Sequence, residues 1–152
     1  MLKKLATDLR NFKTGLLNYL EAPQILDKIT DIKREELLEG KRGDGQKITP
    51  NYEDLPAFAG WYLNFKKSLP TYKLGDGTPD LYIDGTFHRS LFTKQLTGRV
   101  GVYITDSNYS KDFMYDVVIT HNTNGTLLDL TADNVEFIAA MIEDYINKNF
   151  NV

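Results

Sequence analysis

The stretch "HRSLFTKQLTGRVGVYITD", residues 88–106, decides the fold class. Apolar and polar positions alternate with a period of two along residues 100–104, which is the pattern of a half-buried β-strand. A weaker alternation runs along residues 92–96, before a Thr97-Gly98 turn. Two such runs around a glycine turn predict a β-hairpin. Because an isolated hairpin is marginally stable in water, this one must pack on helices or join a larger sheet.

Helical periodicity dominates the chain before the hairpin. Residues 2–20 repeat leucines and one phenylalanine every three or four positions, as in an amphipathic helix. A second helix is predicted to begin at Pro23 and to stop at Gly40, because proline suits the first helical position and glycine the position after the last. We expect the charged residues between Asp27 and Glu39 to form its solvated face.

The C-terminal stretch "LTADNVEFIAAMIEDYI", residues 130–146, predicts a long helix. Thr131 is a good N-cap, and Asp133 and Glu136 place negative charge near the positive end of the helix dipole. Its apolar stripe consists of Val135, Ile138, Ile142, Tyr145 and Ile146. Helices around a small, mainly antiparallel sheet, with this helix packed on the sheet, make an α+β fold.

The segments between these elements are less regular. Residues 41–56, "KRGDGQKITPNYEDLP", hold two glycines, two prolines and no apolar period, which predicts an exposed loop. An aromatic-rich helix with Trp61 and Phe65 in the core is predicted at residues 57–68. Residues 110–121 fit either a short helix or a strand, and we favour the helix. We therefore expect one domain over residues 1–152, helical up to residue 40.

Composition excludes several classes of protein. Apolar residues make up 41% and charged residues 26% of the chain, as in a folded protein. The net charge of −3 provides no positive field for nucleic acid, and the absence of cysteine removes disulfides and thiolate metal sites. Charged and polar residues interrupt the N-terminal apolar positions, so neither a signal peptide nor a membrane span is expected. We expect an intracellular protein.

The run His88-Arg89-Ser90 is the most suggestive candidate for chemistry. In an extended segment His88 and Ser90 would share a face, but no third group is evident, so the run is better explained as the entry to a strand. A metal site would draw on His88 and His121, the two histidines of the chain, which share no local ligand spacing. We expect no catalytic site, metal or cofactor.

Aromatic residues are more numerous than a small core needs. Nine tyrosines, eight phenylalanines and one tryptophan make up 12% of the chain, which fits a protein with interfaces and fits equally an α+β core filled by aromatic side chains. The stretch "WYLNFKKSLPTYK", residues 61–73, mixes aromatic and basic residues as a nucleic-acid platform does. An acidic chain lacks the accompanying field, so an amphipathic helix is the better interpretation.

The order of several short motifs resembles the tail-completion or virion-morphogenesis proteins of tailed bacteriophages, over roughly residues 30 to 147. The stretches that carry the resemblance are "LLEGKRGDGQKI", "PDLYIDGTFHRSL", "THNTNG" and "LTADNVEFIAAMIEDYI". The positions that match the motifs of this family are Gly40, Asp44, Gly45, Leu81, Gly85, Phe87, Ser90, His121 and Gly125. The turn at His121 has an extra residue, and "LDL" replaces the Arg-Pro-Phe often found before the last helix.

The resemblance implies a structural virion protein and no enzyme. It would form a homo-oligomeric ring at the neck or upper tail, next to portal, connector or tail-tube proteins. Subunit or partner contacts are then expected at Lys41, Arg42, Tyr52 and Arg89. Two other classes stay open: a small intracellular hydrolase or metal-dependent enzyme using His88 and His121, and a monomeric module that binds peptides or nucleic acid.

Overall fold

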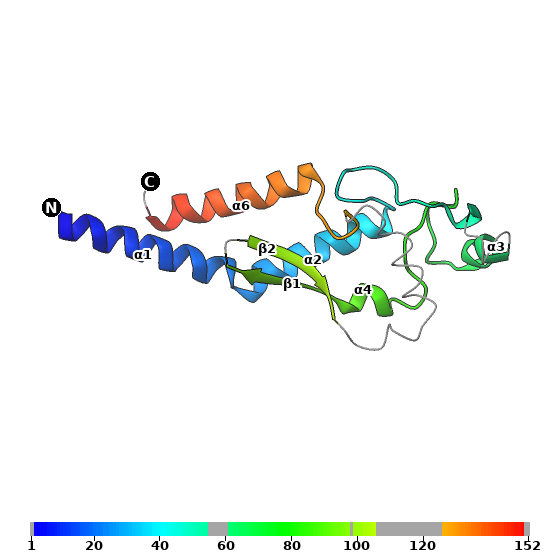
Figure 1. Ribbon diagram of the computed structural model, residues 1–152, viewed down its shortest axis with the longest axis horizontal. Coiled ribbons are helices and arrows are strands. Elements are labelled where there is room, and N and C mark those ends of the chain that lie inside the picture. The colour runs from blue at the N-terminus through cyan, green and yellow to red at the C-terminus, as the bar shows by residue number, and fades with distance from the viewer. Residues whose placement is uncertain (1, 55–60, 98, 106–125, 151–152) are drawn as a thin grey trace.

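The computed structural model describes residues 2–54, 61–97, 99–105 and 126–150, and it has the predicted α+β architecture. Figure 1 shows α1 and α6 side by side at one end of the molecule and α3 at the other. The described elements are α1 (Leu2–Leu20), α2 (Pro23–Leu38), the 3-10 turn η1 (Tyr52–Asp54), α3 (Trp61–Ser68), α4 (Thr86–Ser90), β1 (Leu91–Leu96), β2 (Arg99–Ile104) and α6 (Ala132–Phe150).

Helix α2 ends at Leu38, and Gly40, the predicted stop, follows its C-cap residue Glu39. The glycine has a left-handed φ of 69°, and its N–H donates to the carbonyl of Leu37 at 2.9 Å. The N–H of Lys41 donates to the carbonyl of Glu36 at 2.8 Å, which completes a Schellman cap. A Cβ at Gly40 would lie 2.5 Å from Cγ2 of Thr78. Glycine is therefore required both by the backbone conformation and by the turn that packs on it.

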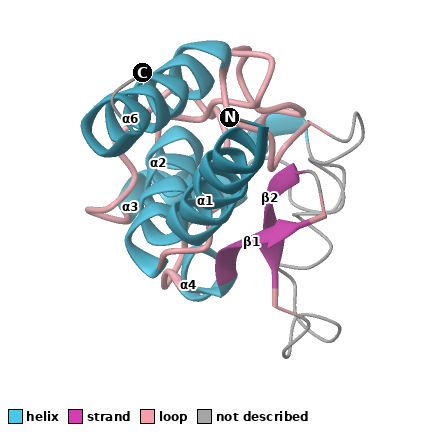
Figure 2. Ribbon diagram, turned by 90° about the vertical axis from the view of Figure 1, so that its left-hand side faces the viewer, coloured by secondary structure: helices cyan, strands magenta, loops and turns pink. Residues whose placement is uncertain are grey.

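The predicted hairpin is confirmed. Strands β1 and β2 pair antiparallel, with Leu91 opposite Ile104. The hairpin is supported by α2, because the hydroxyls of Thr30 and Thr93 share a hydrogen bond of 2.7 Å between helix and strand. Arg34 Nη2 also donates to the carbonyl of Leu91 at 3.2 Å. Figure 2 shows the helices gathered on one side and the two strands on the other.

The residues before β1 are helical, so the predicted strand entry at His88-Arg89-Ser90 is wrong. They belong to α4, a helix of 5 residues that follows the left-handed Gly85, with φ 82°. The N–H of Thr86 donates to Oδ1 of Asp84 at 2.8 Å and so fixes the first turn. This local hydrogen bond from a side chain favours a helical turn over a strand at these residues. The alternation of apolar and polar side chains does not reveal such a bond.

Most of the described residues in the segment 41–56 are exposed, as its composition predicts, but the segment is not exposed throughout. Ile48 and Tyr52 are fully buried, and both belong to the hydrophobic core together with Leu37, Leu81 and Leu127. Glycines and prolines shape the turns of this segment, while its two isolated apolar side chains hold it to the core. The sequence pattern did not reveal these two buried positions, because their contacts are distant in sequence and have no period.

Helix α3 turns the opposite face to the core from the one predicted. Trp61 and Phe65 are 58% and 38% exposed, whereas Tyr62, Leu63 and Lys66 are buried. The ammonium group of Lys66 is neutralised inside the protein by Asp80. Residues 57–60 of the predicted helix lie outside the described residues.

Helix α6 confirms the predicted long C-terminal helix. Its apolar side, with Val135, Ile138 and Ile142, faces β2 and α2 across an apolar groove of about 420 Å³. Toward its C-terminal end α6 packs on α1, where the rings of Tyr19 and Tyr145 stack with centroids 3.8 Å apart. Residues 110–121, predicted as helix or strand, lie outside the described residues.

Candidate functional site

The matched positions in residues 80–91 shape the core and a turn. Leu81 and Phe87 are buried, and Leu81 has an unusual positive φ of 53°. Ser90 is also buried, and its hydroxyl donates to the carbonyl of Phe87 at 2.7 Å. Gly85 has a φ of 82°, a conformation that glycine adopts readily, and so allows a tight turn. The segment therefore fixes the chain around the preceding Asp80.

Asp80 and Lys66 form an ion pair inside the core. Their side chains are 2% and 0% exposed, and Nζ of Lys66 lies 2.7 Å from Oδ1 of Asp80. The same oxygen accepts from the hydroxyl of Tyr52 at 3.1 Å and from the N–H of Tyr82 at 3.2 Å. Lys66 also donates to the carbonyl of Tyr82. A buried charge pair of this kind is tolerated only because its remaining polar atoms are bonded.

Tyrosine rings surround the ammonium group of Lys66. Its Nζ lies 5.4 Å from the centre of the Tyr52 ring and 5.0 Å from that of Tyr72, within the range of cation–π attraction. Burial lowers the pKa of Lys66, while Asp80 acts in the opposite direction. Burial raises the pKa of Tyr52 well above its ordinary value and raises that of Tyr72 to about 12. All three groups are therefore bound internally and are not exposed reagents.

His88 is buried beside Asp80. It is 5% exposed, and its Nε2 shares a hydrogen bond of 3.0 Å with the carbonyl of Asp80. Burial lowers the pKa of His88, which favours the neutral ring. Ser90, the partner suggested by the sequence, bonds to backbone instead. This placement disfavours a nucleophile and base at His88 and Ser90.

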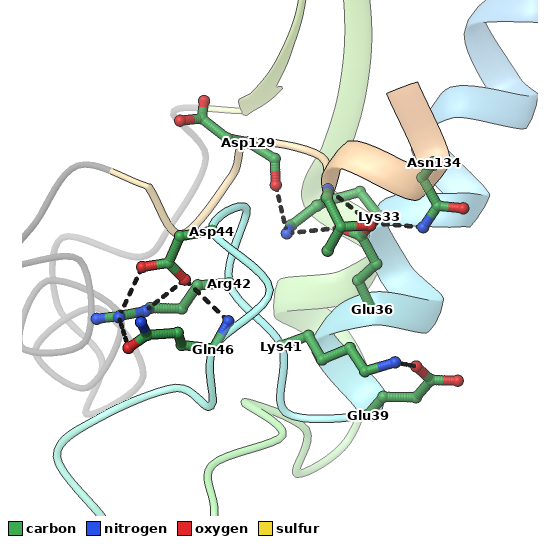
Figure 3. Close-up of polar contacts among 10 residues, drawn as sticks. Lys33, Glu36, Glu39, Lys41, Arg42, Asp44, Gln46, Asp129 and Asn134 are labelled. Atoms are coloured by element: carbon green, nitrogen blue, oxygen red, sulfur yellow. Dashed lines mark hydrogen bonds and ion pairs between the residues drawn. The ribbon is translucent and has the colours of Figure 1, made fainter. Parts of the chain in front are cut away.

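A second buried ion pair joins α2 to α6, and the sequence did not predict it. Lys33 and Glu36 are 0% and 3% exposed, with Nζ 2.9 Å from Oε2 (Figure 3). Oε1 of Glu36 accepts from the N–H of Thr131 at 2.9 Å, from its hydroxyl at 2.7 Å and from Asn134 at 2.5 Å. The carboxylate of one helix thus caps the N-terminus of another.

The electrostatics of this second pair follow from its contacts. Burial lowers the pKa of Lys33 against the attraction of Glu36. Burial alone would raise the pKa of Glu36, but its hydrogen bonds from Asn134, Thr131 and Lys33 outweigh that effect and leave the pKa below its ordinary value. The signal that could have found this pair is its spacing, because Lys33 and Glu36 continue the stripe of Ile29 and Ile32 along α2.

The glycine loop after α2 lies against the segment that leads into α6. The carboxylate of Asp44 binds Arg42 at 2.8 Å, and its other oxygen accepts from the N–H of Gln46 at 3.0 Å. The N–H of Gly43 donates to the carbonyl of Thr126 at 3.0 Å. Figure 3 shows this loop close to Asp129 and to the second ion pair. Gly45, with φ 76°, closes the turn.

The four predicted contact residues divide into two groups. Tyr52 is fully buried and Arg42 is 7% exposed, so the prediction that they form surface contacts is wrong. Burial of Tyr52 is needed for the bond to Asp80, and that of Arg42 for the bond to Asp44. Lys41 and Arg89 are exposed. A contact at these two residues stays a prediction.

Helices α1 and α6 present a large unburied apolar surface. No residue of either helix is buried, although both are amphipathic. Among their large apolar side chains, Leu2, Leu5 and Leu9 are 81%, 55% and 60% exposed, and Val135 and Phe137 are exposed as well. Apolar residues repeated along one helix face normally lie against a partner. This surface is the best candidate for an interaction site.

Two predicted positions and one alternative cannot be placed. His121 and Gly125 lie outside the described residues. The alternative metal site, which would use His88 and His121, therefore lies partly outside them too. Among the residues that the structure describes, no cluster of three metal-ligating side chains occurs. Within the same part of the chain, no helix has the length and apolar character needed to cross a membrane.

Comparisons of this chain with models of protein families, with curated proteins and with solved structures find no match. The resemblance to tail-completion proteins therefore stays a prediction. Functional interpretation depends on the internal ion pairs and on the apolar surface of α1 and α6.

Proposed function

We propose that this chain is a structural subunit that associates with copies of itself. The observation that carries the proposal is the apolar surface of α1 and α6, two helices of 19 residues each in which no residue is buried. Exposed apolar faces of this length lower the solubility of a monomer and stabilise an assembly that covers them. Exposed Trp61 and Phe65 on α3 add aromatic surface at the other end of the molecule.

The interior supports a structural role in a second way. The buried charged groups are bonded to one another and to backbone: Lys66 with Asp80, and Lys33 with Glu36. Catalytic groups need access to substrate and are usually found in a cleft. Lys66 and Asp80 instead join segments 14 residues apart, and Glu36 bonds to Thr131 and Asn134 at the start of α6, as expected of a scaffold that must keep its shape in an assembly.

The motif order of the sequence favours one assembly in particular. We propose that the chain is a head–tail connector or tail-completion subunit, which forms a homo-oligomeric ring at the neck or upper tail of a tailed bacteriophage. Portal, connector or tail-tube proteins would be its neighbours in the virion. Lys41 and Arg89 are exposed and remain available for contacts with such neighbours.

Deletion of the gene from the phage that carries it tests this proposal. We expect filled heads and tails to accumulate unjoined, because the missing ring provides the joint between them, and infectivity to fall by orders of magnitude. Expression of the full chain in trans should restore joined particles. Electron microscopy of the lysates and plaque counts are the measurements. Normal joined particles after the deletion would contradict the proposal.

A further inference from the structure

Helix α1 has the spacing of a coiled-coil seam. Its apolar residues recur at alternating intervals of three and four, which are the a and d positions of a heptad repeat. The seam consists of Leu2, Leu5, Leu9, Phe12, Leu16 and Tyr19. Such a repeat over the whole helix is more regular than burial of one face against a globular core requires, and it is typical of helices that pack along one another.

Helix α6 covers only the C-terminal half of this seam. Phe150 lies edge-on to Phe12, with ring centroids 5.0 Å apart, and a Cβ at Gly15 would meet the Phe150 ring at 2.6 Å. Tyr145 then stacks on Tyr19. In Figure 1 the N-terminal end of α1 extends beyond the C-terminal end of α6.

The N-terminal half of the seam is left open. Leu2, Leu5 and Leu9 stay exposed, and a groove of about 390 Å³ lies where α6 ends, between Leu5, Leu9 and Phe150. Full burial of each open leucine would strengthen association by roughly ten-fold or more, given the transfer free energy of such a side chain. The seam therefore has both the space and the driving force for another helix.

The charges beside the seam indicate which helix fits. In the heptad frame Asp8 occupies a g position and Lys13 an e position five residues later. In a parallel coiled coil the g residue of one helix faces the e residue of the next helix five positions on. A second α1 in the same register thus brings Asp8 of one copy to Lys13 of the other. Both side chains are exposed, and neither forms an ion pair with the described residues.

We propose that the open N-terminal half of α1 binds the α1 helix of a second copy of this chain, in parallel and in register. This inference rests on the proposed function, because it names the surface by which the subunits associate. A parallel, in-register contact between equivalent residues is isologous and joins two copies, so a ring of more copies needs a second, heterologous contact elsewhere on the subunit. The contact places Leu5 against Leu5 and Leu9 against Leu9 of the neighbouring copy.

Sedimentation of the full-length protein tests the seam. We expect the wild type to associate, and the double variant Leu5→Lys/Leu9→Lys to be monomeric, with an association constant lower by at least about ten-fold for each lysine. The matched control is Thr7→Lys/Thr14→Lys, which adds the same charge on the opposite face of α1 and should associate as the wild type does. Circular dichroism verifies that each variant is folded.

Charge exchange tests the facing pair. Asp8→Lys alone places two lysines opposite each other and Lys13→Asp alone places two aspartates, so each variant should associate more weakly than the wild type. An equimolar mixture of the two variants should regain association, because the lysine introduced in one variant then faces the aspartate introduced in the other. A mixture that stays as weak as its components would contradict the contact between these positions.

A single cysteine tests the direction and register, since the chain contains no cysteine of its own. Oxidised Leu5→Cys should form a covalent dimer in high yield, because equivalent d positions face each other only in a parallel, in-register pair. Oxidised Thr7→Cys should form little covalent dimer, because Thr7 lies on the opposite face of α1. Equal yields of covalent dimer from the two cysteine variants would overturn the proposed α1 contact. A wild type that is monomeric at every concentration would overturn it as well. Unchanged association of Leu5→Lys/Leu9→Lys would also overturn it, while the proposed function would still be decided by the gene deletion.

Discussion

Replacement of Asp80 by Asn is expected to lower the free energy of unfolding by about 3–5 kcal/mol, the usual cost of breaking a buried ion pair from one side. Asparagine preserves the shape of the side chain, and its oxygen can still accept from Tyr52. The loss arises because Lys66 then keeps a positive charge in the core with no opposite charge beside it. Urea or thermal unfolding followed by circular dichroism measures the change.

The control for Asp80 is the same substitution in an exposed ion pair. Asp144→Asn removes the partner of Lys148, whose side chain is 69% exposed, and should change stability by less than about 1 kcal/mol. A double variant, Lys66→Met/Asp80→Asn, removes the isolated charge and should be more stable than the sum of the two single losses predicts. Additive losses would show that Lys66 and Asp80 do not stabilise each other.

Replacement of Glu36 by Gln should also lower the free energy of unfolding, by about 3 kcal/mol or more. The amide removes the charge that Lys33 needs and turns an N–H donor toward its ammonium. It also weakens the cap on α6, because a neutral oxygen accepts more weakly than a carboxylate from Thr131 and Asn134. Hydrogen exchange of the first amides of α6 should accelerate. Glu39→Gln, three residues away and on the surface, is the matched control.

The contribution of Glu36 to the free energy of unfolding should also depend on pH. Its pKa in the folded protein lies below the ordinary value of 4.5, so its contribution is fully present above that pH and is lost as the pH falls through the lowered pKa. The difference in stability between the wild type and Glu36→Gln should therefore shrink below about pH 4.5. A difference that stays constant down to about pH 2 would contradict the role assigned to this carboxylate.

Helices, strands and turns that depend on residues close together in the sequence could be predicted. Apolar periodicity predicted α1, α2 and α6, and the alternation of residues 100–104 predicted the hairpin. Gly40 stops α2 as expected, because its left-handed conformation follows from its residue type and position. Gly75 and Gly77, on either side of Asp76, likewise have positive φ angles of 72° and 85°.

The candidate site could not be predicted, because charged residues in its core resemble surface residues in the sequence. The charged residues of α2 were predicted to be solvated, yet Lys33 and Glu36 are buried with partners, and Lys66 of α3 is buried with a partner as well. Their partners Asp80 and Thr131 are 14 and 95 residues away. Spacing along α2 could have placed Lys33 and Glu36 on its buried stripe, but composition and periodicity carry no information about partners this distant in the sequence.

The two errors at Tyr52 and Trp61 have the same origin. Tyr52 stands alone among polar residues, which suggests a loop, but its hydroxyl bridges Asp80 and the N–H of Leu81 at 3.1 Å each. Trp61 was predicted to lie in the core together with Phe65, as part of an amphipathic helix. The helix turns Lys66 inward instead, because the buried Asp80 binds it, and Trp61 is left 58% exposed.

The copy number of this chain in assembled phage particles tests the central claim most directly. Imaging of purified particles at a resolution that separates subunits should locate the chain at the neck or upper tail, in several copies related by rotation about the tail axis. Neighbouring copies should meet along the N-terminal half of α1. A single copy per particle, or complete absence of the chain from the particles, would contradict a structural, self-associating subunit.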